Sequence, residues 1–281
     1  MLKTTKISFP GLGIGEFSVN SEAFSLFGIS IAWYALIIAT GMLLAVLYIM
    51  YRAKGIGIKS EEILDFAIFV IPFGIIGCRI YYVLMEIENY HSFKDVINIR
   101  EGGLAIYGGI IAGAITVFVI CMVKKINFLA FADCVVPGLI LAQAIGRWGN
   151  FMNGEAYGYA TDIFCRMGLD FGYGFSYFHP TFLYESLWNI IGFIAINLYF
   201  KHKKFDGELF LLVFGWYGLG RAWIEGLRTD SLYLFNTDIR VSQLLAIAIF
   251  VTAAASLTYL YIKRPNKKLY YREYKNEERQ G

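Results

Sequence analysis

The chain has 281 residues, of which 57% are hydrophobic and only 17% are charged, and its formal net charge is +3. A soluble domain is about 45–50% apolar and about a quarter charged, so this composition excludes an ordinary soluble protein. The aromatic share of 17% is typical of the aromatic belts found at both membrane interfaces. The sequence therefore predicts an all-α integral membrane protein.

The membrane spans are predicted from continuous apolar runs, and a span needs about 20 such residues. The segment from Met1 to Gly28 lacks the continuous apolar core of a signal peptide, so the first long run is expected to be kept as a span. Tyr34 follows Trp33 early in that run, at an aromatic-belt position. Seven windows qualify: residues 29–50, 63–85, 104–123, 128–148, 181–200, 208–227 and 239–262.

Lysine and arginine are concentrated in alternate connections, which predicts the orientation. One side carries fifteen: Arg52, Lys54, Lys59, Lys124, Lys125, Lys201, Lys203, Lys204, Lys263, Arg264, Lys267, Lys268, Arg272, Lys275 and Arg279. The other side carries six, with Arg240 at the boundary: Lys3, Lys6, Lys94, Arg100, Arg166 and Arg228. We therefore expect the N-terminus outside and the C-terminus in the cytoplasm.

This pattern predicts one seven-span membrane domain over residues 1–262, with a small extracytoplasmic head at about 149–179. Residues 263–281 are expected to form a basic cytoplasmic tail, solvated beside anionic headgroups. The four cysteines, Cys78, Cys121, Cys134 and Cys165, form no CxxC pair and are interpreted as small hydrophobic residues. With only three scattered histidines, no metal site is predicted.

The third span opens with glycines on both sides of Tyr107, in the string EGGLAIYGG. Glycine allows a helix end to approach a ligand or a neighbouring backbone closely. The following Gly109-x-x-x-Gly113 spacing is typical of helix packing. Tyr107 is either a site residue or one more interfacial tyrosine.

The fourth span ends in a polar string, GRWGNFMNGE, at residues 146–155. It holds Arg147, Asn150, Asn153 and Glu155. An arginine at the centre of a bilayer costs about 2.5–3.5 kcal/mol on insertion scales, so intramembrane arginines mark functional sites by default. The string is expected to bind a polar or anionic group.

The sixth span carries Tyr217, Arg221, Glu225 and Arg228 at i, i+4, i+8 and i+11, a single helical stripe. Arg147 and Arg221 on different helices would form a bidentate clamp for a phosphate or carboxylate. The alternative is that each arginine pairs with a structural carboxylate, such as Arg221 with Glu225, and joins helices.

Two further features stay open. Arg79, in the second span, is an intramembrane arginine with no evident partner. The string HPTFLYE, residues 179–185, is interpreted as the start of the fifth span with Pro180 at a first helical position.

With these strings in view, the chain resembles the prolipoprotein diacylglyceryl transferases of bacteria. The string GRWGNFMNGEAYG at residues 146–158 matches the family signature G-R-x-G-N-F-x-N-x-E-x-x-G at every fixed position. The strings GGLAIYGG, HPTFLYE and YGLGRAWIEGLR match its other blocks in order, so the similarity spans about Tyr34 to Gln243.

The resemblance implies a membrane enzyme that moves the diacylglyceryl group of phosphatidylglycerol onto the lipobox cysteine thiol of a preprolipoprotein and releases glycerol phosphate. It implies that Arg147 and Arg221 hold the lipid phosphate. The expected catalytic residues are Tyr107, Arg147, Asn150, Glu155 and Arg221. The expected substrate-binding residues are Tyr34, Arg147, Asn153, Gly158, Tyr217, Glu225 and Arg228.

One position departs from the family. Some members have a histidine, proposed as the catalytic base, where this chain has Tyr107. Either Tyr107 or Glu155 would then accept the thiol proton, and the residues do not decide between them. The resemblance implies no metal, no organic cofactor and no nucleic-acid partner, and it places the chain in the bacterial cell membrane as a multi-pass protein.

A transporter of an anionic solute is the main alternative function, using the same arginines. Many transporter folds contain paired internal repeats with broken helices, and no such pairing relates the first and last three spans. A seven-helix ligand receptor is the third hypothesis, and only the number of helices favours it.

Overall fold

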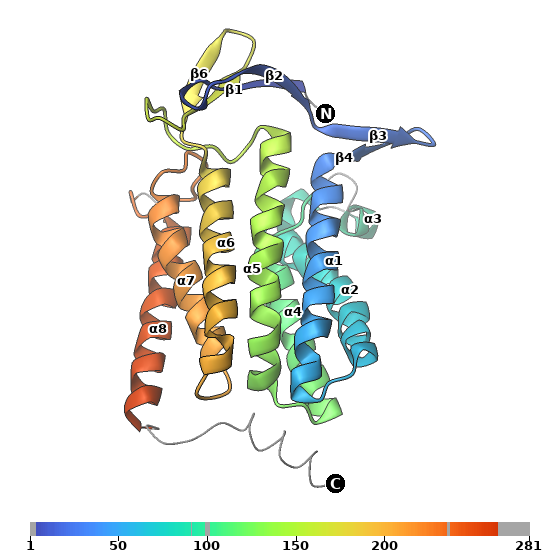
Figure 1. Cartoon of the computed structure of the whole chain (residues 1–281). Coiled ribbons are helices and arrows are strands. Elements are labelled where there is room, and N and C mark those ends of the chain that lie inside the picture. Colours follow the sequence, from blue (N-terminus) through green and yellow to red (C-terminus); the bar gives the residue numbers. More distant parts are fainter. Residues whose placement is uncertain (1–3, 91, 99–101, 235–236, 264–281) are drawn as a thin grey trace. The chain divides into compact units, whose positions relative to one another are not determined.

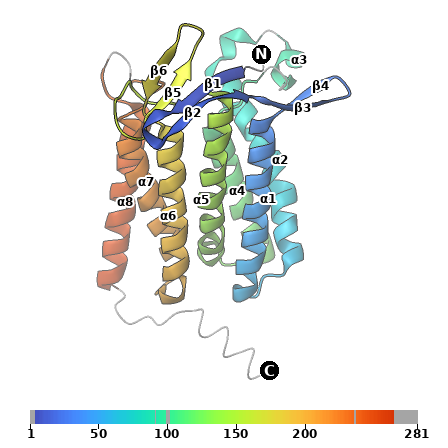
Figure 2. The ribbon, with the colours of Figure 1, turned by 45° about the horizontal axis from the view of Figure 1, so that its top comes forward.

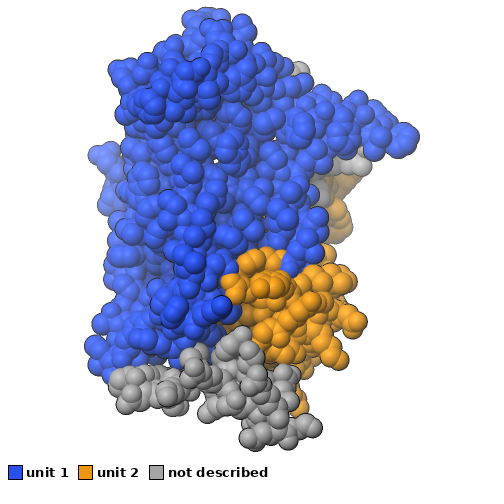
Figure 3. Space-filling view, viewed as in Figure 1, with its two compact units in different colours: residues 1–47, 135–281 blue, residues 48–134 orange. Residues whose placement is uncertain are grey.

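The computed structural model of the chain describes residues 4–90, 92–98, 102–234 and 237–263 (Figure 1). Two compact units are distinguished (Figure 3): unit 1 contains residues 1–47 and 135–281, and unit 2 contains residues 48–134.

The α-helices are α1 (Trp33–Ala53), α2 (Ser60–Met85), α3 (Phe93–Ile97), α4 (Ile106–Lys124), α5 (Phe128–Asn153), α6 (Thr181–Tyr199), α7 (Glu208–Glu225) and α8 (Val241–Lys263). The strands are β1 (Thr4–Phe9), β2 (Ile14–Asn20), β3 (Glu22–Leu26), β4 (Ile29–Ala32), β5 (Met167–Asp170) and β6 (Phe175–Phe178).

Each predicted span coincides with a helix, with ends that differ by a few residues. Among the described residues, six helices are long and apolar enough to cross a membrane: α1, α2, α4, α5, α6 and α8. The protein is therefore a multi-pass membrane protein. Helix α7, which carries the charged residues Glu208, Arg221 and Glu225, is not among these six. The count of seven spans and the orientation therefore stay predictions.

The prediction of an all-α fold is wrong in one respect, because unit 1 also contains two antiparallel sheets. Strands β2, β1, β5 and β6 form a four-stranded sheet in that order, and β3 pairs with β4. Strand β1 is central and pairs Ile7 with Leu169 of β5. The strands have only four to seven residues, too few for a clear local period, and β1 and β5 lie far apart in the chain. The sequence therefore did not reveal the sheets.

The four-stranded sheet closes the end of unit 1 at which α5 ends and α6 begins (Figures 1 and 2). Its inner face is apolar, and Phe182 of α6 packs into it together with Phe151 of α5. The rings of Phe151 and Phe182 lie 4.8 Å apart. This core holds the ends of α5 and α6 in register beneath the sheet. The core residues are Ile7, Phe9, Val19, Met167, Leu169 and Phe182.

In unit 2, α2 and α4 pack closely through glycine. A Cβ on Gly108 would lie under 3.0 Å from the Gly77 carbonyl oxygen, and one on Gly109 would lie 2.5 Å from Cys78 Sγ. The spacing of Gly109 and Gly113 thus belongs to a helix-packing face, as predicted.

The sequence left the partner of Arg79, in α2, open. In the structure its guanidinium is hydrogen-bonded to the protein backbone. Its guanidinium donates to the backbone carbonyl oxygens of Asp95, Val96, Asn98, Gly102 and Gly103 at 2.7–3.0 Å. Its side chain also lies over the Tyr90 ring, 5.0 Å from the centroid. The arginine therefore fixes the connection that leads into α4.

The predicted basic tail, residues 263–281, lies outside the described residues except for Lys263. Lys3 and Arg100, which entered the count of charges for the orientation, also lie outside them.

Candidate active site

The site is built where α5, α6 and α7 of unit 1 meet near the sheet. A hydrogen-bond chain joins α5 to α6 at this point. Trp148 Nε1 donates to Ser186 Oγ at 3.2 Å, and Ser186 Oγ donates to the carbonyl oxygen of Ala144 at 2.9 Å. Arg147 precedes Trp148 in the sequence, and Glu185 precedes Ser186. The same contacts therefore position both charged side chains.

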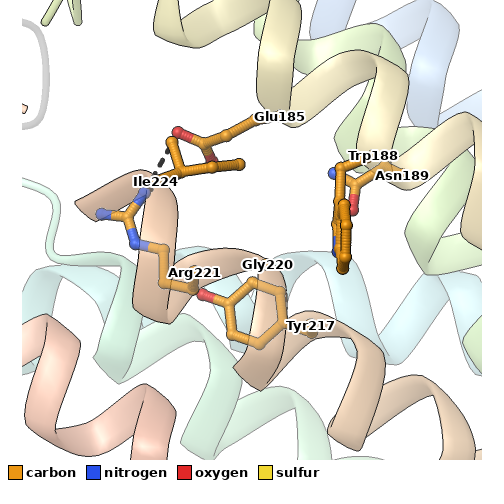
Figure 4. A pocket seen from close by; sticks show the side chains of 7 residues that line it. All are labelled: Glu185, Trp188, Asn189, Tyr217, Gly220, Arg221 and Ile224. Carbon is orange, nitrogen blue, oxygen red and sulfur yellow. Dashed lines mark hydrogen bonds and ion pairs between the residues drawn. The ribbon is translucent and has the colours of Figure 1, made fainter. Parts of the chain in front are cut away.

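Glu185 is the centre of the charged cluster. Arg147 Nη2 of α5 forms an ion pair with its Oε2. Arg221 Nη1 of α7 and Arg228 Nη1 each lie 3.2 Å from its Oε1. The Glu185 side chain is only 7% exposed, so three guanidiniums converge on one buried carboxylate. Figure 4 shows Glu185 and Arg221 reaching toward each other from α6 and α7.

Two more carboxylates balance the cluster. Glu225 Oε2 lies 2.6 Å from Arg221 Nη2, and Asp230 Oδ2 lies 2.6 Å from Arg228 Nη2. The three arginines therefore face three carboxylates within the protein. Since an unpaired buried charge is costly, this balance makes the cluster stable before any ligand arrives.

Arg228 and Asp230 lie beyond the end of α7, and their pKa values shift in the directions of a strong ion pair. Burial opposes the charge on Arg228, but its hydrogen bond to Asp230 and the nearby Glu185 raise the pKa of the guanidinium above its ordinary value. The hydrogen bond from Arg228 lowers the pKa of the Asp230 carboxyl. Both groups are therefore charged at neutral pH.

The predicted stripe on the sixth span is only partly helical. Tyr217, Arg221 and Glu225 lie on α7, but the helix ends at Glu225. Arg228 follows in a turn, where its N–H donates to the Glu225 carbonyl oxygen at 3.2 Å. The prediction of four residues on one helix is thus wrong for Arg228, although its side chain still reaches the cluster through Glu185.

A pocket opens between α6 and α7 beside the cluster. Its lining residues are Glu185, Trp188, Asn189, Tyr217, Gly220, Arg221 and Ile224 (Figure 4). Arg221 and Tyr217 come from the predicted site, and Trp188 and Asn189 were not predicted. The lining combines charged Glu185 and Arg221 and polar Asn189 and Tyr217 with the apolar Trp188 and Ile224.

The end of α5 carries a second set of polar contacts that continues from Arg147. Arg147 Nη1 donates to Asn150 Oδ1 at 3.4 Å, and Asn150 Nδ2 donates to Glu155 Oε1 at 3.0 Å. Asn153 Nδ2 donates to the same Glu155 oxygen at 3.2 Å. The four polar residues of the signature therefore form one connected network.

Gly158 and Tyr34 lie at close backbone approaches. A Cβ on Gly158 would lie 2.6 Å from the Leu227 carbonyl oxygen, so only glycine lets this strand-like segment pass beside the turn that carries Arg228. A Cβ on Gly149 would lie 2.8 Å from the Tyr34 ring. Tyr34 of α1 thus packs on α5 at Gly149.

Tyr107 belongs to unit 2, whereas the arginine cluster belongs to unit 1. It lies in the first turn of α4, and its ring centroid is 6.4 Å from that of Tyr81.

Glu185 is the main residue that sequence reasoning missed. The signal was present, because Glu185 is the single charged residue in the predicted span 181–200. A lone carboxylate in an apolar helix requires a partner, and Arg147, Arg221 and Arg228 were available to pair with it.

The described part of the chain thus defines a class: a multi-pass membrane protein with a buried arginine–carboxylate centre beside a small pocket between α6 and α7. Comparison with known proteins narrows this class. The prolipoprotein diacylglyceryl transferase family model matches residues 21–259, so the chain belongs to that family. This confirms the resemblance drawn from the sequence.

Curated relatives are similar over most of their length. The phosphatidylglycerol–prolipoprotein diacylglyceryl transferase 1 of Clostridium perfringens is 46% identical over 89% of this chain and 97% of its own. The enzymes of that name, without the numeral, from Enterococcus faecalis and Clostridioides difficile are each 44% identical. The match to the Enterococcus faecalis enzyme covers 91% of this chain and 95% of that enzyme. The match to the Clostridioides difficile enzyme covers 89% of this chain and 98% of that enzyme.

Proposed function

We propose that this protein transfers the diacylglyceryl group of phosphatidylglycerol to the lipobox cysteine of preprolipoproteins, the first step of lipoprotein maturation. The convergence of Arg147, Arg221 and Arg228 on Glu185 carries the proposal. The relatives named above are phosphatidylglycerol–prolipoprotein diacylglyceryl transferases. The proposed location is the bacterial cytoplasmic membrane, with seven spans, the head outside and the C-terminus inside.

The reaction is a displacement at carbon. The thiolate sulfur of the substrate cysteine attacks the glycerol carbon that bears the phosphate ester, and a carbon–sulfur bond forms. The carbon–oxygen bond breaks, its electron pair leaves with the phosphate oxygen, and glycerol phosphate departs. The thiol proton passes to a base on the enzyme. Because negative charge grows on the departing phosphate, cations placed beforehand stabilise the transition state more than the bound lipid.

Arg147 and Arg221 are the proposed phosphate ligands. A guanidinium has five N–H donors in a planar fork. Glu185 and Glu225 each engage one terminal nitrogen of Arg221, so the fork can still donate to a phosphate. The Arg147 and Arg221 side chains keep 25% and 16% exposure, which supports access for a headgroup.

Glu185 is proposed as the positioning residue of this clamp. By pairing with guanidiniums from α5 and α7 and from the turn after α7, it holds them at one point before the lipid arrives. Preorganised charges of this kind need no rearrangement during the reaction.

The remaining predicted residues are proposed to support binding. Tyr34, Tyr217 and Asn153 would contact the lipid or the signal peptide. Glu225 and Arg228 would keep Arg221 and Glu185 in place, through the ion pairs already described. Gly158 would act through the close approach of its backbone to Leu227.

The proton acceptor is proposed to be Tyr107 or Glu155. Glu155 Oε1 accepts hydrogen bonds from the side-chain amides of Asn150 and Asn153, which hold the carboxylate in place. The pH dependence of transfer by Tyr107→Phe and Glu155→Gln variants separates the two. An unchanged profile in both variants would exclude both residues.

The proposal is tested with purified protein in liposomes that contain phosphatidylglycerol with labelled acyl chains and a lipobox peptide. Wild-type protein should move the label onto the peptide. Arg147→Lys or Arg221→Lys should slow transfer by roughly 10²–10³-fold, because lysine keeps the charge but loses the bidentate fork.

The matched control is Arg52→Lys, since Arg52 Nε donates to the Tyr48 hydroxyl at 2.8 Å and the residue belongs to unit 2, outside the arginine cluster. It should keep the wild-type rate. Wild-type transfer by Arg221→Lys would overturn the proposal, and so would flux of an anionic solute without consumption of the lipid, which is the result expected of a transporter.

A further inference from the structure

Strands β3 and β4 form a two-stranded ribbon that pairs with no other described strand. Its turn consists of Phe27 and Gly28, with φ angles of 51° and 78°. Positive φ at both positions is the geometry of a tight hairpin turn, and it is unusual for a bulky residue. Phe27 therefore stands at the outermost point of the ribbon, where it is 96% exposed.

The ribbon has two chemically different faces. The register pairs Phe24 with Ile31 and Ser25 with Ser30. Because successive side chains of a strand point to opposite faces, Phe24 and Leu26 share one face and the serines share the other. Ser30 Oγ also donates to Glu22 Oε1 at 2.9 Å. One face is thus apolar and the other polar.

The apolar face is open. Phe24 and Leu26 are 48% and 51% exposed. An isolated two-stranded ribbon is at best marginally stable in water, so this one requires a surface to cover its apolar face.

The attachment of the ribbon identifies that surface. Strand β4 ends at Ala32 and the membrane helix α1 begins at Trp33, with no residue between them. The Trp33 N–H also donates to the Ser21 carbonyl oxygen at 2.9 Å, which ties the base of the ribbon to the first residue of the helix. Figures 1 and 2 both show the ribbon leaving the end of α1 sideways instead of extending the helix. It must therefore lie at the level where α1 leaves the bilayer.

We propose that the β3–β4 ribbon lies in the membrane interface, with Phe24, Leu26 and Phe27 among the lipid acyl chains and Ser25 and Ser30 in water. The ribbon from Glu22 to Ala32 contains no lysine or arginine. Its binding is therefore apolar and does not require anionic headgroups, unlike basic amphipathic anchors. The ribbon acts as a lateral anchor beside the first span.

The experiment places an environment-sensitive fluorescent amino acid at one position at a time in the full chain, reconstituted in vesicles of phosphatidylglycerol and phosphatidylcholine. Positions 24 and 27 are compared with positions 25 and 30 as matched controls on the same ribbon. Quenching is measured with iodide in water and with nitroxide groups on the lipid acyl chains.

Positions 24 and 27 should show blue-shifted emission, quenching by the lipid nitroxides and a several-fold smaller iodide quenching constant than positions 25 and 30. The result should be the same in vesicles of phosphatidylcholine alone. Equal iodide quenching at positions 25 and 27 would overturn the proposal by placing the ribbon in water. Protection from both quenchers would overturn it by indicating a protein partner, such as a second copy. Loss of protection without phosphatidylglycerol would also overturn it, since binding would then be electrostatic.

Discussion

The Glu185 carboxylate determines where three guanidiniums of unit 1 lie, although it has the wrong charge to bind a phosphate itself. It pairs with Arg147, Arg221 and Arg228, and its side chain is 7% exposed. Removing one partner from a buried ion pair costs about 3–5 kcal/mol, because the other charge is left uncompensated. We therefore propose that Glu185 contributes to catalysis through the arginines.

The Glu185→Gln variant tests this positioning role. We expect kcat to fall at least about tenfold, which corresponds to about 1.4 kcal/mol of transition-state stabilisation, because the guanidiniums lose their common anchor. The KM for phosphatidylglycerol should not rise, since the positive charges remain and a competing carboxylate is gone. Steady-state transfer kinetics at varied lipid content measures both constants.

The control is Glu16→Gln, at an exposed position on β2, which should leave both constants unchanged. A raised KM with an unchanged kcat would contradict the positioning role, because Glu185 would then act on the bound lipid.

Arg79, unlike the arginines of the cluster, has a structural role. Its guanidinium serves five backbone carbonyl oxygens, more than the three donors of a lysine can. Arg79→Lys should lower the free energy of unfolding by at least about 2 kcal/mol, since hydrogen bonds to charged groups contribute about 1.5–3 kcal/mol each. Thermal unfolding in detergent, with Arg52→Lys as the control, measures the difference. Equal midpoints for the two variants would contradict the structural role.

At the scale of helices, two tryptophans hold α6 against α7. Trp188 Nε1 donates to the Trp216 carbonyl oxygen and Trp216 Nε1 donates to the Trp188 carbonyl oxygen, both at 3.0 Å. The rings are stacked with centroids 4.2 Å apart. Gly220 and Gly192 make room for them, since a Cβ on either would lie under 3.0 Å from an indole nitrogen.

Gly220→Ala should therefore separate α6 from α7. We expect a loss of about 1–3 kcal/mol in stability, typical of overpacking, and reduced transfer because Glu185 and Arg221 lie on these two helices. Gly215→Ala is the matched control on α7, because its Cβ would meet Ala253 Cβ at an ordinary 3.6 Å. Thermal unfolding and the transfer assay check both variants. Wild-type stability and wild-type transfer in Gly220→Ala would contradict this prediction, because α6 and α7 would then tolerate a wider spacing.

The helices were predictable from the sequence and the strands were not. Apolar runs about 20 residues long are a local signal, and each span came within a few residues of its helix. The pairing of β1 with β5 joins Ile7 to Leu169, a long-range contact that no local period encodes. The same reason explains the site: Arg147 and Arg221 stood out as charges in apolar helices, whereas Glu185 became important only once α5, α6 and α7 were brought together.

At the scale of the whole molecule, α7 decides the topology. It carries three charged residues, Glu208, Arg221 and Glu225, and all three are paired within unit 1. Glu208 is fully buried and accepts a hydrogen bond from the Tyr199 hydroxyl at 2.6 Å, and Arg221 pairs with Glu185 and Glu225. Paired charges inside a bundle remove most of the cost of crossing a bilayer.

We therefore expect positions 204 and 232, before and after α7, to lie on opposite sides of the membrane. A protease site inserted after Leu232 should be cut by protease added to protoplasts, and one after Lys204 only after the membrane is permeabilised, because the lysines around position 204 favour the cytoplasmic side. A site after Tyr173, which is fully exposed in the β5–β6 turn, serves as the outside control. Cutting of both test sites from one side would contradict the seven-span topology.

The most direct test of the proposed phosphate clamp is an experimental structure of the full chain with phosphatidylglycerol bound in a lipid nanodisc. We expect the headgroup phosphate to lie within hydrogen-bonding distance of the guanidiniums of both Arg147 and Arg221, with Glu185 still in contact with at least one of them. A phosphate bound away from both arginines, with each still paired only to its carboxylates, would contradict it.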